Sequence, residues 1–211
     1  EVKACQRLLE THLKQRPFEV QQVEMVDHHT AHAQAAYRTQ PRSQCLVITV
    51  DAMGDGQSVT VRVGRDGELE PGFAQSGLAA INTYYSRTTE WLGFTPNRHE
   101  GKVTGLAAHG QVSAEQIARF EEFAWPMVRA LGQLMRWDIR FDGDRPSVLA
   151  VNRHRTEQYR AQLSEFSDAE LAACVQTVTE RIVLEMVDRA RELAGDGFDR
   201  ICLAGGLFAN V

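Results

Sequence analysis

The sequence predicts an α/β fold, and three observations along the chain support it. A continuous apolar run at residues 45–51 (CLVITVD) and an alternating run at 57–64 (QSVTVRVG) indicate neighbouring strands. The chain then becomes mainly helical up to residue 195, and a second apolar run at 198–206 (FDRICLAGG) indicates another strand. Strands, then helices, then a strand favour α/β layering.

Residues 2–16 are predicted to form the first helix. Leu8, Leu9 and Leu13 recur there at helical spacing, and the ring of Pro17 is expected to stop the helix.

The next segment is predicted to be a strand at residues 18–26 (FEVQQVEMV), followed by a helix at 30–38 (TAHAQAAYR). The helix is rich in alanine, and either Asp27 or Thr30 is expected to cap its N-terminus. Three histidines lie within five residues at this junction, in the stretch VDHHTAHAQAAY at residues 26–37.

The middle of the chain is predicted to be a β-meander. Its strands are expected at residues 45–51, 57–64 and 69–73, joined by the glycine-containing turns AMGDG and RDGE.

Helices are predicted after the meander. The expected segments are residues 78–93, 100–110, 113–135 with a break near Pro126, and 168–195 beginning near Ser167 and ending at Gly195.

Composition and charge narrow the function classes. The formal net charge is −5 and no cluster of lysine and arginine is present, so a nucleic acid is not the expected partner. No apolar run approaches the roughly 18 residues that span a bilayer, so no membrane partner is expected. Cys45, Cys174 and Cys202 occur in apolar contexts without CxxC spacing, which predicts buried thiols in a reducing, cytoplasmic protein.

The ends of the sequence favour a piece of a longer protein. Glu1 already lies in an amphipathic pattern, and the sequence stops soon after a Gly-Gly turn. Residues 1–211 are therefore expected to form part of one domain, and open sheet edges would favour a homodimer.

The histidine cluster has the spacing of a metal site. His28 and His32 are four residues apart, which puts both rings on one face of a helix, where they could share a divalent ion. His29 would point elsewhere, and its position after His28 excludes the HExxH protease motif. A surface HxxxH that binds nothing remains an equal alternative.

A hairpin follows with an acid at the end of its first strand. Asp51 could hold a metal, and Gly54 and Gly56 could let backbone N–H groups approach a phosphate. The alternative is an ordinary hairpin whose Asp and Gly residues only form the turn.

Two later glycine segments could bind a nucleotide. The first contains Glu100 and Lys102, suited to ribose hydroxyls and a phosphate, or equally to a solvated charge pair. In the second, Gly205 and Gly206 stand between a strand and an expected helix N-terminus, where phosphates bind, although a plain tight turn is the commoner meaning.

The motifs taken in order resemble the carbamoyltransferase family, which includes the nodulation-factor and antibiotic O-carbamoyltransferases. The matching stretches are HHTAHAQAA, VDAMGDG, SGLAAINTYYSRTTEWLGF, HEGKVTGLAAHG and LAGGLFAN, which together span residues 28–210. A more distant similarity is to the tRNA threonylcarbamoyl-transfer enzymes, which share the HxxxH and the Gly-Gly turn.

This resemblance implies an actin-like nucleotide-binding fold of the sugar-kinase and Hsp70 type. It implies an enzyme that uses ATP and carbamoyl phosphate to make a carbamoyl-adenylate, then passes the carbamoyl group to a hydroxyl of a small acceptor. A separate adenylate-forming domain and an upstream nucleotide hairpin would lie outside this sequence.

The resemblance also implies roles for residues. His28, His32 and Asp51 would be metal ligands, with Fe(II) the expected ion, and would form the catalytic centre. The residues implied to bind the nucleotide and its phosphates are Gly54, Gly56, Glu100, Gly101, Lys102, Gly105, Gly205, Gly206 and Asn210.

Three positions depart from the family pattern. Ala52 stands where a glycine follows the aspartate, Gln57 stands where an acid follows the last glycine, and Thr104 stands where the family usually has methionine. The departures at Ala52 and Gln57 motivate an alternative from another class, a catalytically inactive module that binds nucleotide and metal. A relative acting on a tRNA nucleoside is a further alternative.

Overall fold

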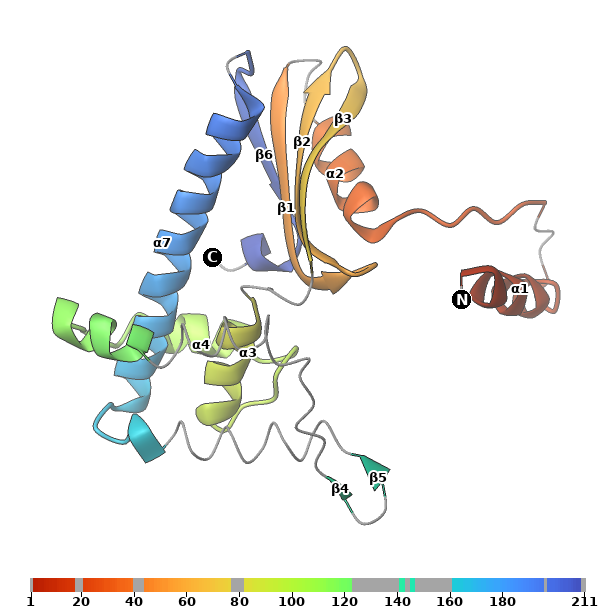
Figure 1. Cartoon of the computed structure of the whole chain (residues 1–211). Helices are drawn as coiled ribbons and strands as arrows, with labels where there is room; N and C mark the ends of the chain where they lie inside the picture. The colour runs from red at the N-terminus through yellow and green to blue at the C-terminus, as the bar shows by residue number, and fades with distance from the viewer. Residues whose placement is uncertain are drawn as a thin grey trace.

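A computed structural model describes residues 2–17, 21–39, 44–76, 82–122, 141–142, 145–146, 161–195 and 197–209 (Figure 1). The helices are α1 (Val2–Leu13), α2 (His28–Arg38), α3 (Asn82–Trp91), α4 (Glu100–Ala107), α7 (Asp168–Ala194) and the 3-10 turn η2 (Gly206–Ala209). The strands are β1 (Cys45–Gly54), β2 (Gln57–Arg65), β3 (Glu68–Ser76), β4 (Phe141–Asp142), β5 (Arg145–Pro146) and β6 (Arg200–Ala204).

The main sheet has the order β3-β2-β1-β6. β1, β2 and β3 form the predicted antiparallel meander, and β6 pairs with β1 in parallel. Asp55 and Gly56 both have positive φ, 49° and 80°, as a two-residue type I′ hairpin turn requires. Asp66 and Gly67 repeat this arrangement at the second turn. The fold is therefore α/β with a mixed sheet.

Helices cover both faces of this sheet (Figure 1). On one face Ala33 and Tyr37 of α2 pack against Cys45 and Val47 of β1. On the other face Leu46, Ile48 and Val50 of the same strand pack in a cluster that includes residues of α7 and η2. Because successive side chains of a strand alternate between faces, one continuous apolar strand supplies both layers.

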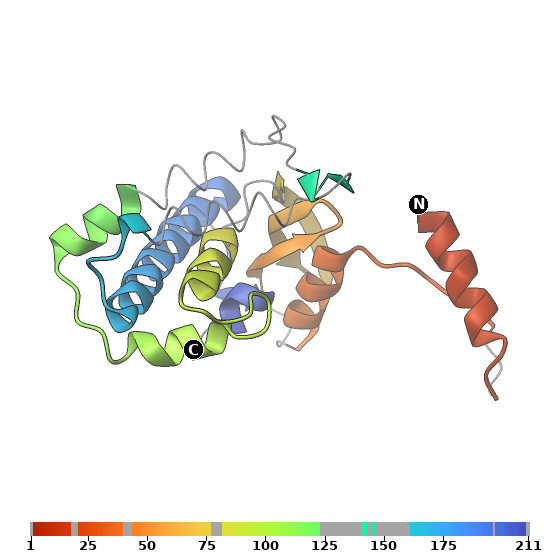
Figure 2. The ribbon, with the colours of Figure 1, turned by 90° about the horizontal axis from the view of Figure 1, so that it is seen from below.

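A second core lies beside the sheet, where α3, α4 and the N-terminal half of α7 come together (Figure 2). Tyr84, Trp91, Val103 and Val175 are almost completely buried in it. The Tyr84 hydroxyl lies 2.7 Å from Thr179 Oγ1, which ties α3 to α7. This core fixes α3 and α4 relative to the sheet.

The thiols behave as predicted. Cys45, Cys174 and Cys202 are buried and form no disulfide. Burial raises the pKa of Cys174 to about 12 and, first among several causes, that of Cys202 to about 11, so both remain protonated near neutral pH.

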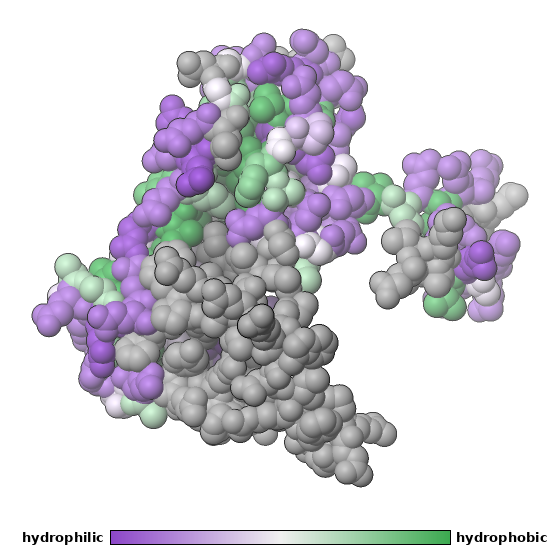
Figure 3. Space-filling view, in the orientation of Figure 1, coloured by the Kyte–Doolittle hydropathy of each residue, from purple (hydrophilic) through white to green (hydrophobic). Residues whose placement is uncertain are grey.

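Some apolar surface remains open to solvent. Leu184 of α7 and Ile201 and Leu203 of β6 are exposed. Figure 3 shows hydrophobic surface where α7 approaches the sheet. None of the helices in the described ranges is both long and apolar enough to cross a membrane.

One predicted strand is wrong. A strand is expected at residues 18–26, but residues 21–27 have no regular secondary structure, and residues 18–20 lie outside the described residues. Met25 and Val26 are exposed, and no described strand runs alongside to supply the hydrogen bonds that a strand needs. The following helix also begins at His28, two residues before the predicted start.

The other predicted elements are confirmed where the structure describes them. α1, the meander, α3, α4, α7 and β6 all lie within the predicted segments or within a few residues of them. Of the segment 113–135, residues 114–122 are helical. The expected break near Pro126 lies outside the described residues.

α7 begins with a complete capping box. The Ser167 hydroxyl accepts from the Glu170 backbone N–H, and the Glu170 carboxylate accepts from the Ser167 backbone N–H. We expect Ser167→Ala to lower the free energy of unfolding by about 1 kcal/mol, because the substitution leaves a helix N–H without its acceptor. Urea denaturation would measure the change.

The matched control is Ser164→Ala in the exposed turn just before the cap, which should stay within about 0.5 kcal/mol of wild type. Equal losses in both variants would show that the capping box contributes nothing.

Candidate functional site

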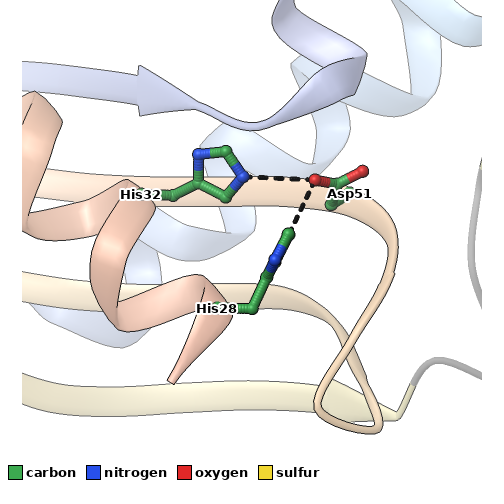
Figure 4. Close-up of side chains that lie close together, drawn as sticks. All are labelled: His28, His32 and Asp51. Atoms are coloured by element: carbon green, nitrogen blue, oxygen red, sulfur yellow. Dashed lines mark hydrogen bonds and ion pairs between the residues drawn. The ribbon is translucent and has the colours of Figure 1, made fainter. Parts of the chain in front are cut away.

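The first turn of α2 presents two imidazoles to the end of β1. Asp27 caps the helix, its Oδ1 accepting from the Thr30 N–H at 2.7 Å. His28 and His32 lie one turn apart on the helix face that meets Asp51 (Figure 4). The structure thus brings the predicted HxxxH pair and the strand-end aspartate together.

The three side chains converge on one point. Asp51 Oδ2 lies 2.9 Å from His28 Nε2 and 3.2 Å from His32 Nε2. One potential ligand atom from each residue lies within 4.8 Å of the other two. The side chains of His28, His32 and Asp51 are 42%, 35% and 24% exposed, so an ion can reach them from solvent.

This donor set fits a divalent transition metal. With metal–ligand bonds of about 2.0–2.1 Å, neighbouring ligand atoms are separated by roughly 3.0 Å in an octahedral site and 3.4 Å in a tetrahedral one. Asp51 Oδ2 lies 2.9 and 3.2 Å from the two imidazole nitrogens, close to these values. Two imidazoles and one carboxylate on one side of an ion, with the remaining positions open, are the facial triad typical of non-haem Fe(II).

The surroundings of Asp51 favour its ionised carboxylate form. Burial opposes its ionisation, but a hydrogen bond with His28, the N–H of Ala52 and the nearby charges of His28 and His32 together keep the pKa of Asp51 below its ordinary value. The Ala52 N–H donates to Oδ1 at 2.8 Å, which leaves Oδ2 directed at the imidazoles.

His29 does not belong to this group of possible ligands, as predicted. It is completely buried, with Nδ1 2.7 Å from Thr49 Oγ1 and Nε2 3.1 Å from the Gln57 carbonyl. A carbonyl can only accept, so Nε2 carries a proton, and in the tautomer with that single ring proton Nδ1 accepts from Thr49. Thr60 Oγ1, 2.7 Å from Thr49 Oγ1, must then donate to it. This chain of hydrogen bonds anchors α2 to β1 and β2.

A pocket of about 390 Å³ extends from Asp51 toward α3 and α4. Its lining combines polar side chains with small and apolar ones, and comprises Asp51, Ala52, Asn82, Tyr85, Ser86, Asn97, Glu100, Gly101, Thr104, Gly206, Leu207 and Ala209. The pocket therefore brings one of the candidate metal ligands, Asp51, together with three of the residues predicted to bind nucleotide, namely Glu100, Gly101 and Gly206.

The Glu100 carboxylate is held in place within this pocket. Its Oε1 accepts from the Asn97 N–H at 2.6 Å and from Ser86 Oγ at 3.1 Å. Asn82 Oδ1 is buried without a hydrogen-bond partner in the described part of the chain. An amide oxygen of this kind is suited to accept from a ligand hydroxyl or amine.

Other predicted residues have structural roles or lie elsewhere. Lys102 Nζ lies 5.5 Å from the centre of the Phe94 ring, and neither Lys102 nor Gly105 lines the pocket. Gly205 has φ 101°, and a Cβ there would collide with the Val50 carbonyl, so only glycine fits.

The hairpin glycines also lie outside the pocket lining. Gly54 packs directly beneath the His28 ring, where a Cβ would collide with it, and Gly56 completes the type I′ turn. Asn210 lies outside the described residues.

The sequence reasoning missed several pocket residues. Asn82, Tyr85, Ser86, Asn97 and Thr104 line the pocket without belonging to any motif with a chemical meaning of its own. The one available signal was that four of them lie within the two stretches that carry the family resemblance. Asn82, Tyr85 and Ser86 lie within residues 76–94, and Thr104 lies within residues 99–110.

The sequence matches the Carbamoyltransferase N-terminus family over residues 2–211. The chain belongs to this family. The resemblance to the carbamoyltransferase family, drawn from the order of the motifs, is therefore confirmed.

Curated relatives agree with this assignment. The chain is 28% identical over 190 residues to the nodulation protein NolNO of Sinorhizobium fredii, covering 89% of this chain and 26% of that protein. It is 28% identical over 189 residues to the nodulation protein NolO of Bradyrhizobium diazoefficiens, covering 88% of this chain and 32% of that protein. It is 27% identical over 205 residues to the uncharacterised protein MJ1058 of Methanocaldococcus jannaschii, covering 90% of this chain and 32% of that protein. The chain thus spans about a quarter to a third of the length of these relatives.

The anchor of α2 can be tested by stability measurements. Thr49→Val keeps the shape of the side chain but leaves His29 Nδ1 buried without its donor, so we expect the free energy of unfolding to fall by about 1–3 kcal/mol. Thr60→Val leaves the bond between Thr49 and His29 in place and should cost less, at most about 1.5 kcal/mol. Urea denaturation of both variants checks the order, and a larger loss in Thr60→Val would contradict the proposed direction of the hydrogen bonds.

Proposed function

We propose that the protein takes part in transferring a carbamoyl group to a hydroxyl of a small acceptor, with His28, His32 and Asp51 at the reaction centre. One observation supports this proposal above the others. Two imidazoles converge on the Asp51 carboxylate, which also lines a pocket, in a chain that belongs to the carbamoyltransferase N-terminus family.

Metal binding is the first part of the proposal. His28, His32 and Asp51 would hold one divalent ion, and the facial set of two histidines and a carboxylate favours Fe(II). When bound, such an ion supplies Lewis-acid polarisation of a carbonyl or phosphoryl oxygen.

The donor is the second part. We propose that the carbamoyl group comes from carbamoyl phosphate and reaches this domain as a carbamoyl-adenylate made with ATP, as the resemblance implies. Glu100 would accept from the ribose hydroxyls of this nucleotide. Gly206 has no side chain, and a Cβ there would come within 3.2 Å of Asp51 Oδ1. The absence of a side chain at this position would leave room for the phosphate.

The transfer step then requires little covalent chemistry from the protein. The acceptor oxygen forms a bond to the carbamoyl carbon, the bond from that carbon to the phosphate oxygen breaks, and AMP and a proton leave. The roles of the pocket are to orient the two reactants and to keep them close, which can supply much of the rate. Asn82 and Thr104 offer polar groups to hold a hydroxylated acceptor.

The fold proposed for this function is actin-like. The meander β1-β2-β3, with β6 added in parallel beside β1 and helices on both faces, agrees with one α/β lobe of such a fold. The pocket at the carboxyl ends of β1 and β6 is where open α/β sheets bind their ligands.

Replacing one predicted ligand tests the reaction centre. In the longest form of the protein that contains this chain, we expect His32→Ala to lose bound iron and to lower carbamoyl transfer by about 100-fold or more. Residues that merely support metal ligands already change affinity or activity by about 10–100-fold. Iron would be measured by elemental analysis after anaerobic loading, and transfer with ATP, radiolabelled carbamoyl phosphate and a panel of sugars and amino sugars.

The matched control is His109→Ala, which removes an exposed histidine from the turn after α4. It should keep both iron and activity. Unchanged iron and transfer in His32→Ala would remove the proposed centre, and ATP and iron binding without any transfer would favour an inactive binding module.

A further inference from the structure

The turn of the β1-β2 hairpin reaches across to the first residue of α2. The His28 backbone N–H donates to Asp55 Oδ2 at 2.7 Å, a contact between residues 27 positions apart. Asp55 does not belong to the group of possible ligand atoms formed by His28, His32 and Asp51. Its carboxylate therefore contacts the backbone of a candidate ligand without being part of the ligand set.

This contact satisfies a group that helices leave unpaired. The first backbone N–H groups of an α-helix have no acceptor within the helix, and His28 is the first residue of α2. A carboxylate accepting such an N–H forms a charge-assisted hydrogen bond and is also stabilised by the helix dipole. The bond fixes the position of the first residue of α2 relative to the hairpin turn.

The same hairpin holds the His28 side chain from two further positions. Asp51 Oδ2 lies 2.9 Å from Nε2, and Gly54 lies beneath the ring, where no side chain would fit. The His28 ring also meets the rings of His29 and His32 edge-on, at 5.5 and 4.7 Å between centroids, and 42% of its side chain is exposed. Three residues of one hairpin, Asp51, Gly54 and Asp55, thus help to fix its position.

The backbone conformation of Asp55 also supports a role for its carboxylate. Asp55 has φ 49°, a conformation in which glycine carries no steric cost. Aspartate is tolerated in such turns as a turn former alone, but here its carboxylate leaves the turn and bonds to another element.

We propose that Asp55 is a positioning residue for the metal centre, which sets the place of His28 through its backbone N–H. This inference rests on the proposed metal-binding function. Asp55 touches neither the ion nor the reactants and acts only through His28.

Two variants of Asp55 distinguish the effect of its carboxylate from the effect of the turn conformation. Asp55→Gly keeps the backbone conformation and removes the acceptor, whereas Asp55→Asn keeps both an acceptor oxygen and tolerance of positive φ. Co(II) would serve as the metal probe in the purified protein, followed by its absorption spectrum. We expect Asp55→Gly to raise the Kd for Co(II) by about 10-fold or more, in the range typical of lost supporting contacts, and Asp55→Asn to bind nearly as wild type.

The third variant, His28→Ala, tests whether Asp55 acts through His28. Adding Asp55→Gly to His28→Ala should change the Kd for Co(II) no further, because the ligand that Asp55 positions is already gone. An equal additional loss in the double variant would overturn the proposal and would instead make Asp55 a ligand or a general stabiliser.

Hydrogen exchange gives a readout that needs no metal. The His28 amide should exchange slowly in wild type and Asp55→Asn, and quickly in Asp55→Gly. A His28 amide equally fast in all three proteins would overturn the inference even if Co(II) binds. Failure of wild type to bind Co(II), with the His28 amide still protected, would overturn the proposed metal function and with it the role of Asp55, while leaving the hydrogen bond established.

Discussion

The site depends on how α2 is fastened to the sheet. A buried chain of hydrogen bonds runs from Thr60 through Thr49 to His29 and on to the Gln57 carbonyl. Each member is satisfied, and a fully satisfied buried network fixes one arrangement because any displacement strands a polar group. His29 is therefore the histidine that orders the other two, although it is not one of the three possible ligands.

The sheet topology supplies the rest of the site. β6 runs parallel to β1, so the two strands end at the same edge and Gly205 reaches the backbone of Val50. The carboxyl end of β1 carries Asp51, and the turn after β6 brings Gly206 beside it. α3 and α4, fixed by the second core, close the pocket from the other side. Segments separated by more than 150 residues of sequence thus meet at Asp51.

Much of this arrangement could be predicted from local patterns. The meander follows from alternating side chains and from Asp-Gly turns, whose chemistry is local, and α7 follows from its period and its cap. The approach of His28 and His32 to each other follows from helical spacing alone. Their approach to Asp51 was only a hypothesis, because it depends on how α2 packs on β1, which the sequence does not encode locally.

The failures have the same origin. Residues 21–27 have the composition of a strand, but strand formation needs a neighbour that composition cannot reveal. The contact from Asp55 to His28 could not be predicted, because a backbone N–H carries no sequence signature.

The irregular end of β1 limits how this hairpin can vary. Between the pairs Val50–Val59 and Gly54–Gln57, Asp51, Ala52 and Met53 stand opposite Ser58 alone, so the strand bulges there. Surface hairpins usually tolerate insertions and deletions, because their length matters little to the core. Here one residue more or fewer between Asp51 and Asp55 would turn one of the two carboxylates away from α2. Among homologous chains that keep the centre, the length of this loop should therefore be invariant even where its sequence is not.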